Sequence, residues 1–84
     1  MLTINYFASI REALNQSQDK LELPDSVRTV NQLIDYLGAS DRNKLAILTQ
    51  DDKVLVAVNQ TIVSRDYGLR GDEEIAFFPP MTGG

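Results

Sequence analysis

The chain has 84 residues, the size of one small domain, and its hydrophobic fraction of 43% and charged fraction of 24% are those of a globular protein. It contains neither Cys nor His, which excludes disulfides, a thiolate nucleophile, a Cys-based metal site and the usual general base. The formal net charge is −4 and the basic residues form no cluster, so we expect no binding to nucleic acid or to an anionic membrane.

The first predicted elements are two strands separated by a short helix. Residues Leu2–Phe7 alternate between apolar and polar, which predicts a strand with one buried face. Phe7 falls on the polar side of that alternation, so it is either the turn into the next element or an exposed aromatic. Ser9–Glu12 has the spacing of a capping box and predicts a short helix. Lys20–Leu23 alternates again and ends at Pro24, as expected of a hairpin partner for the first strand.

The clearest predicted helix begins at Thr29. Thr29 and Gln32 form a second capping box. The apolar residues behind them follow helical spacing and predict one buried face: Val30, Leu33, Ile34 and Leu37. Gly38 stands where the residue that ends a helix is expected.

The second half of the chain predicts a helix and three strands. In order, these elements are a short helix capped by Ser40 or Asp41 and running through Leu48, a turn at Asp51–Asp52, a continuously apolar strand at Val54–Val58, a turn at Asn59–Gln60, a short strand at Thr61–Val63, a turn at Gly71–Glu74 and a last strand at Ile75–Phe78.

This order of elements predicts an α+β fold. A hairpin followed by a crossover helix is expected to place the strand at Val54–Val58 parallel to the first strand. The economical arrangement is a mixed sheet with one main helix packed across one face, which is the β-grasp, or ubiquitin-like, architecture. We expect this domain to comprise residues 1–78, with an extended tail at 79–84, and we expect the second face of the sheet to be open.

An open sheet face is polar unless something binds there. Phe7, Ile62 and one of Phe77 or Phe78 are candidates for an exposed apolar cluster at the base of the tail. The alternation leaves open which Phe faces outward, because two prolines follow directly. Such a cluster would be a docking surface that aims the tail.

The charged residues point to no competing site. The acidic runs Asp51–Asp52 and Asp72–Glu74 lie in predicted turns, lack metal-ligand spacing, and are expected to be solvated. Lys53 is either a surface charge or a group that pairs with a partner or reaches toward its chemistry, and Arg11 has the same two interpretations. No phosphate-binding loop, dinucleotide fingerprint or nucleophile elbow is present. No stretch has signal-peptide or membrane-spanning character, so we expect a cytoplasmic protein.

The ending Gly83-Gly84 is therefore the main chemical candidate. Pro79 and Pro80 hold the preceding segment extended, and residues 79–84 reach about 20 Å at about 3.3 Å per residue. Two residues without a Cβ let a narrow site enclose the terminal carboxylate. A carboxylate is a poor electrophile, so it must first be activated, and adenylation by ATP is the standard route. Capture by a sulfur donor would then give a thiocarboxylate, and capture by a thiol or an amine would give a conjugate.

Four segments resemble one family specifically. They are Phe7–Glu12, Val58–Val63, Leu69–Glu73 and the ending Phe77–Gly84 with its Phe-Pro-Pro-x-Thr-Gly-Gly pattern. In this order they are similar to the small subunits of molybdopterin synthase, whereas residues 15–52 match weakly. The resemblance implies a β-grasp sulfur carrier of molybdenum-cofactor biosynthesis with no catalytic machinery and no bound cofactor of its own.

The resemblance also implies partners and residue roles. An E1-like enzyme would use ATP to adenylate Gly84, a sulfur donor protein would supply the sulfur for a thiocarboxylate, and the tail would deliver it to a pterin precursor inside the large synthase subunit, in a heterotetramer. Gly83 would give the tail its passage. Implied partner contacts are Phe7, Arg11, Ile62, Phe77, Phe78, Pro79, Pro80, Met81 and Thr82, and no metal site is implied.

Two other functions share this fold and remain alternatives. The first is a sulfur carrier for thiamine synthesis or for tRNA thiolation, against which only the Phe-Pro-Pro-x-Thr context argues. The second is a ubiquitin-like module that binds partners non-covalently or is conjugated to them.

Overall fold

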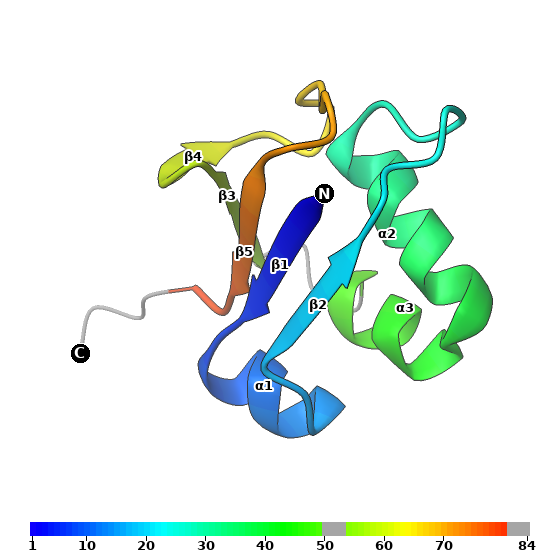
Figure 1. The fold of residues 1–84 in the computed structure, drawn as a ribbon. Coiled ribbons are helices and arrows are strands. Elements are labelled where there is room, and N and C mark those ends of the chain that lie inside the picture. Colours follow the sequence, from blue (N-terminus) through cyan, green and yellow to red (C-terminus); the bar gives the residue numbers. More distant parts are fainter. Residues whose placement is uncertain (50–53, 81–84) are drawn as a thin grey trace.

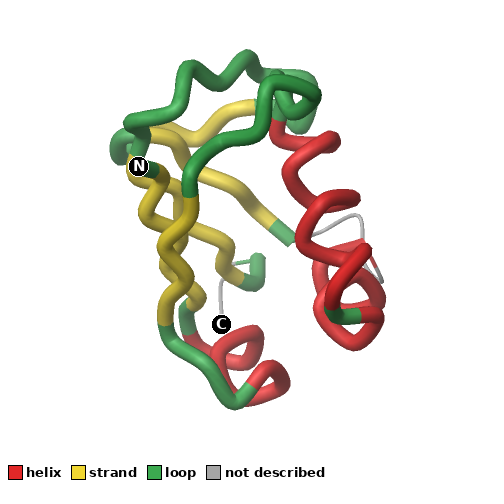
Figure 2. The backbone as a smooth tube through the Cα atoms, turned by 45° about the vertical axis from the view of Figure 1, so that its right-hand side comes forward, coloured by secondary structure: helices red, strands yellow, loops and turns green. Residues whose placement is uncertain are grey.

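The computed structural model describes residues 1–49 and 54–80, which form a mixed sheet with two helices packed against one face and a third helix at its end (Figure 1). The elements are β1 (Leu2–Tyr6), α1 (Ala8–Leu14), β2 (Gln18–Leu21), α2 (Val30–Ser40), α3 (Arg42–Thr49), β3 (Leu55–Val58), β4 (Thr61–Val63) and β5 (Glu74–Phe78). Figure 2 shows the strands and the helices α2 and α3 as two layers. The expected α+β architecture is confirmed. The turn expected at Asp51–Asp52 lies outside the described residues.

The strand order is β2-β1-β5-β3-β4. β1 pairs antiparallel with β2 and parallel with β5, whereas β3 pairs antiparallel with both β5 and β4. The prediction that the strand at Val54–Val58 runs parallel to the first strand is therefore wrong. A helical crossover restores the direction of the strand that precedes it. That strand is β2, which runs opposite to β1, and so the parallel neighbour of β1 is the last strand.

The second strand of the first hairpin begins two residues earlier than expected, at Gln18 instead of Lys20. β2 pairs with β1 from Gln18, opposite Asn5, to Leu21, opposite Leu2. Asn15 ends α1 in the left-handed conformation, with φ 53°, so the chain reverses by residue 17. The Gln18 side chain then donates a hydrogen bond to Asn5 Oδ1 at 2.9 Å.

Helix α2 supplies one side of the core as predicted. Val30, Leu33, Ile34 and Leu37 are each at most 5% exposed. They pack in one cluster with Leu2, Ile4 and Tyr6 of β1. The cap at Thr29 is also confirmed, because its Oγ1 accepts the Gln32 N–H at 3.2 Å. In a capping box the Gln32 side chain would accept the N–H of the cap residue, Thr29. Here it accepts the N–H of the preceding residue, Arg28, at 2.7 Å.

Gly38 does not end α2 as its position in the sequence suggested. The helix continues to Ser40, and Gly38 is buried within it. A Cβ at this position would overlap the side chain of Leu45 in α3. The glycine is needed because it lets the two helices approach closely. Asp41 then caps α3, where its Oδ1 accepts the N–H groups of Asn43 and Lys44 at 3.0 and 3.2 Å.

A buried polar network ties α3 to the sheet. Lys44 is 8% exposed, and its Nζ donates to Asp19 Oδ2 at 2.7 Å. The Tyr6 hydroxyl donates to the same oxygen at 2.8 Å, and Gln16 Nε2 donates to Oδ1 at 2.6 Å. Burial by itself raises the pKa of Asp19, but the hydrogen bonds from Lys44, Tyr6 and Gln16 outweigh it and hold this pKa below its ordinary value of 3.8.

We expect Asp19→Asn to destabilise the protein at pH 7 by about 1–3 kcal/mol, because Lys44 loses a charged hydrogen-bond partner. A carboxylate whose pKa is lowered by folding stabilises the fold above its unfolded pKa. That contribution disappears as the pH falls below 3.8 and through the lower pKa of the folded state. Urea unfolding at pH 7, 5 and 3 should therefore show a gap between wild type and variant that narrows at pH 3. The exposed Asp25→Asn variant is the control, and a gap that stays constant with pH would contradict the role given to Asp19.

Candidate functional site

Two of the apolar side chains expected on a docking surface are exposed. Phe7 is 47% exposed and Ile62 is 62% exposed. Phe77, in contrast, is 1% exposed and stacks on Tyr6, with ring centroids 6.2 Å apart. The assignment of Phe77 to the docking surface is therefore corrected to Phe78, which is half-buried. The alternation along β5 sends Ile75 and Phe77 toward the helices and Phe78 toward the open face.

The strand register gathers the open-face residues into one apolar surface. Phe78 lies opposite Leu55, and Ala57 lies opposite both Ala76 and Ile62. Residues opposite each other in a sheet project from the same face. The N–H of Phe7 donates to the carbonyl of Phe77 at 3.1 Å, which places Phe7 beside Phe78. The open-face apolar surface therefore comprises Phe7, Leu55, Ala57, Ile62, Ala76 and Phe78.

Leu55, Ala57 and Ala76 were not among the residues singled out in the sequence. A signal for two of them was present, because residues 54–58 are apolar without interruption. In a strand with a polar open face, every second residue would be polar. The continuous run thus indicates apolar residues on both faces, with Leu55 and Ala57 on the face opposite Val56 and Val58. Leu55 is half-buried, and Ala57 is only 7% exposed.

The backbone at the start of α1 fixes the position of Phe7. Phe7 itself is extended, with φ −121° and ψ 153°, and its carbonyl accepts the N–H groups of Ile10 and Arg11. Ala8 has a positive φ of 52°, in the left-handed region that is uncommon for residues other than glycine. The capping box predicted at Ser9–Glu12 is wrong, because the helix begins at Ala8 and Phe7 occupies the cap without a side-chain hydrogen bond. Phe7 is thus both the turn and an exposed aromatic.

Arg11 and the remaining charged candidates have different environments. Arg11 is exposed in the last turn of α1, one turn from Phe7. There its charge is favourably placed near the carbonyl end of the helix. Lys53 and the pair Asp51–Asp52 lie outside the described residues.

Glu73 is not the solvated loop residue that was expected. It is 7% exposed, and its carboxylate accepts the N–H groups of Arg70, Gly71 and Asp72 at 2.6, 2.8 and 3.1 Å. Burial by itself raises the pKa of Glu73, but these backbone hydrogen bonds outweigh it and lower the pKa below its ordinary value. Its role is to hold the turn before β5, whereas its neighbours Asp72 and Glu74 are exposed. Across residues 1–49 and 54–80, no group of three or more acidic side chains is placed to hold a metal ion.

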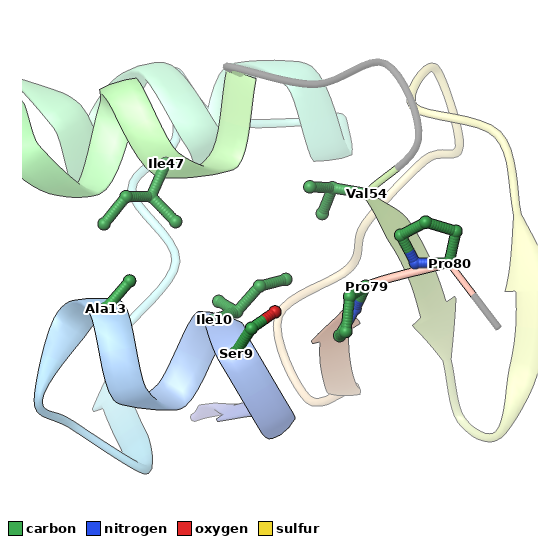
Figure 3. Close-up of a pocket in the computed structure, with 7 residues that line it drawn as sticks. All are labelled: Ser9, Ile10, Ala13, Ile47, Val54, Pro79 and Pro80. Carbon is green, nitrogen blue, oxygen red and sulfur yellow. The ribbon is translucent and has the colours of Figure 1, made fainter. Parts of the chain in front are cut away.

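A groove lies beside the base of the predicted tail (Figure 3). Its volume is about 390 Å³, and Figure 3 shows α1 on one side, α3 on another and the two prolines after β5 closing one end. The lining residues are Ser9, Ile10, Ala13, Ile47, Val54, Pro79 and Pro80. Pro79 and Pro80 are half-buried. The rest of the predicted tail, Met81, Thr82, Gly83 and Gly84, lies outside the described residues, so its extended conformation stays a prediction.

The described part of the chain contains no helix with the length and apolar character needed to cross a membrane. The candidate site has two parts, which meet at the segment that leads to the Gly-Gly ending. One is the open-face apolar surface, which includes Phe78, and the other is the groove lined by Pro79 and Pro80. Among the residues that form these two features, only Ser9 has a polar side chain, and none has a side chain that can act as a general base at neutral pH.

Comparison with known proteins identifies relatives of the whole chain. The model of the ThiS family matches residues 4–84. The chain is 44% identical to the molybdopterin synthase sulfur carrier subunit of Escherichia coli (strain K12), with 100% of both chains covered. It is 37% identical to the protein of the same name from Haemophilus influenzae, again with 100% of both covered.

Solved structures match the fold. A putative molybdopterin converting factor, subunit 1, from Pyrococcus furiosus superposes with a TM-score of 0.73 at 28% identity, covering 95% of this chain and 97% of that one. The small archaeal modifier protein 1 of Haloferax volcanii superposes with a TM-score of 0.74 at 19% identity, covering 95% and 97%. The second likeness concerns the fold alone. Together with the sheet topology, these matches confirm the β-grasp prediction.

Proposed function

The chain belongs to the ThiS family, and we propose that within it the protein is the sulfur-carrier subunit of a molybdopterin synthase. The observation that carries this proposal is the full-length match, at 44% and 37% identity, to two proteins of that name. The family match also extends through Gly84, so it includes the residue on which the proposed chemistry depends.

The proposed chemistry takes place at the carboxylate of Gly84. An E1-like activating enzyme joins this carboxylate to the AMP moiety of ATP and releases pyrophosphate. A sulfur donor protein then supplies sulfur to the acyl carbon, AMP leaves, and Gly84 becomes a thiocarboxylate. In the large synthase subunit this sulfur passes to a pterin precursor, and hydrolysis returns the carboxylate. Each carrier delivers one sulfur, so a dithiolene requires two deliveries.

The open-face apolar surface supports this proposal because it offers a place for partners to bind. Phe7 exposes a large apolar side chain next to Phe78, where β5 leads into the tail. Ile62 exposes another on β4, across β3 on the same face of the sheet. Exposed apolar side chains gathered on one face of a soluble domain mark interaction sites. We propose that the large synthase subunit and the activating enzyme dock here, with Arg11 at the border, and that residues 79–82 contact them as the tail enters. ATP is bound by the activating enzyme and not by this chain.

The proposal is tested by incubating the carrier with the activating enzyme, ATP and a sulfur source, and measuring its mass. The expected result is a shift equal to the exchange of one oxygen for sulfur, located at Gly84 by fragmentation. A carboxylate that remains unmodified under these conditions would sink the proposal. An isopeptide bond from Gly84 to a lysine would instead indicate a protein modifier.

A second assay separates molybdopterin synthesis from the other sulfur-transfer pathways. The thiocarboxylated carrier is mixed with the large synthase subunit and the pterin precursor. We expect sulfur transfer to this precursor and none when a thiamine-pathway acceptor replaces it. The reverse pattern would assign the protein to thiamine synthesis.

A further inference from the structure

The turn between β3 and β4 is joined to the first residue of β5. Asn59 and Gln60 form this turn, and both have a positive φ, of 50° and 71°, as a tight two-residue hairpin turn requires. The N–H of Asn59 donates to the carbonyl of Glu74 at 2.8 Å, and the N–H of Glu74 donates to the side-chain Oδ1 of Asn59 at 3.0 Å. One asparagine thus satisfies both backbone groups of Glu74.

These two hydrogen bonds matter because β4 is otherwise weakly held. It has three residues, lies at the edge of the sheet and, among the described strands, pairs only with β3 (Figure 1). Thr61 and Ile62 are exposed, so Val63 is the one residue of β4 that packs against the core. A short edge strand with few buried contacts belongs to the part of a fold that opens most easily. The contact from Asn59 to β5 therefore braces the hairpin at the end where β4 begins.

Ile62 is the functional candidate whose position depends on this brace. It follows the turn by one residue, its side chain is 62% exposed, and it lies opposite Ala57 in the open-face apolar surface. Ala57 offers only a methyl group to support the larger side chain. When a partner binds, a side chain on a loosely held strand must be ordered, and that ordering lowers the affinity. A hairpin that is already fixed avoids this cost.

We propose that Asn59 is a positioning residue, which holds Ile62 in the place where a docking partner contacts it. This inference rests on the proposed function, because it concerns the surface on which the large synthase subunit is proposed to dock. Asparagine suits the position for two reasons: it tolerates the left-handed backbone, and its side-chain oxygen reaches the N–H of Glu74. Asn59 follows the end of β3 that lies away from Phe78. It therefore acts through β4.

The test is a double-mutant cycle between the two residues. Asn59→Gly removes the side chain without straining the turn, because glycine adopts a positive φ freely. We expect it to weaken binding to the large synthase subunit by about fivefold, the scale of ordering one side chain. Ile62→Ala removes the contact itself and should weaken binding by about tenfold. In the Ile62→Ala background, Asn59→Gly should change the affinity by less than about twofold, because its effect passes through Ile62.

The matched control is Gln60→Gly, which places the same residue in the same turn. Gln60 is exposed and also has a positive φ, so this variant should bind as wild type does. Affinities are measured by calorimetry with the unmodified full-length carrier, and urea unfolding checks that each variant is folded. A loss of stability alone would leave the affinity of the folded carrier unchanged.

Three results would overturn the inference. They are wild-type affinity of either single variant, an equal effect of Asn59→Gly with and without Ile62, and equal weakening by Gln60→Gly. A failure of the proposed function would appear instead in the mass test at Gly84, which involves neither Asn59 nor Ile62. An intact mass shift without coupling between the two residues would therefore count against the positioning role alone.

Discussion

Removal of Gly84 should abolish sulfur transfer while leaving the stability of the domain unchanged. The shortened chain still ends in a glycine carboxylate, that of Gly83, but this group is withdrawn by about 3.3–3.6 Å. Reactive groups displaced by about 1 Å already lose rate by about 100-fold, so we expect a loss of at least that size.

The measurement is sulfur transfer in the reconstituted synthase, with thiocarboxylate formation followed by mass spectrometry. Urea unfolding should give the same midpoint as wild type, because the core cluster is drawn from residues 2–77. The control Gly84→Ala keeps the length of the chain and adds one methyl group. It should form less product than wild type and more than the deletion. Activity of the deletion variant within tenfold of wild type would contradict the role of Gly84.

Phe77→Ala should mainly lower the stability of the domain, whereas Phe78→Ala should mainly lower its affinity for the large synthase subunit. Phe77 is 1% exposed and stacks on Tyr6. Its truncation should cost about 3–5 kcal/mol, as for other buried Phe residues. A domain of this kind has about 5–15 kcal/mol in total, so the variant should unfold at much lower urea concentration.

Phe78 lies on the open face opposite Leu55 and is only half-buried. Phe78→Ala should cost less than about 1.5 kcal/mol in stability, but it should weaken binding to the large synthase subunit by about tenfold. Urea unfolding and calorimetry on both variants separate the two roles. A Phe77→Ala variant as stable as wild type would contradict the inward orientation of Phe77. A Phe78→Ala variant with wild-type affinity would contradict the proposed docking role of the open face.

The sequence predicted the elements that depend on local pattern. Thr29 and the apolar positions behind it identified α2, and Asn59–Gln60 identified the turn between β3 and β4, where both residues have positive φ. Such signals lie within a few residues of each other, so they can be read directly. Gly38 was misread because a helix-ending glycine and a helix-packing glycine look the same in sequence. What separates them is Leu45, a residue of another helix.

For the candidate site, the sequence predicted the exposed apolar residues but not the buried charged ones. Phe7 and Ile62 were identified as exposed, and the Gly-Gly ending was recognised from its residues. The buried roles of Lys44 and Glu73 were not, because a charged residue is normally solvated. Lys44 is buried only because Asp19, 25 positions away, supplies its partner. Glu73 is buried only because the turn at residues 70–72 folds its N–H groups around the carboxylate.

By itself, the sequence led to the proposal of where chemistry occurs. The two glycines at positions 83 and 84 and their resemblance to a known ending pointed to the carboxylate of Gly84 as the group that we propose is activated. The tertiary structure decided what surrounds the segment at residues 78–80 that leads to this ending. It placed β5 beside β1, turned Phe77 inward and Phe78 outward, and formed the groove that Pro79 and Pro80 share with α1 and α3. The physical reason is that alternation gives the period of a strand but not which face is buried. That choice depends on contacts between residues that are far apart in the chain.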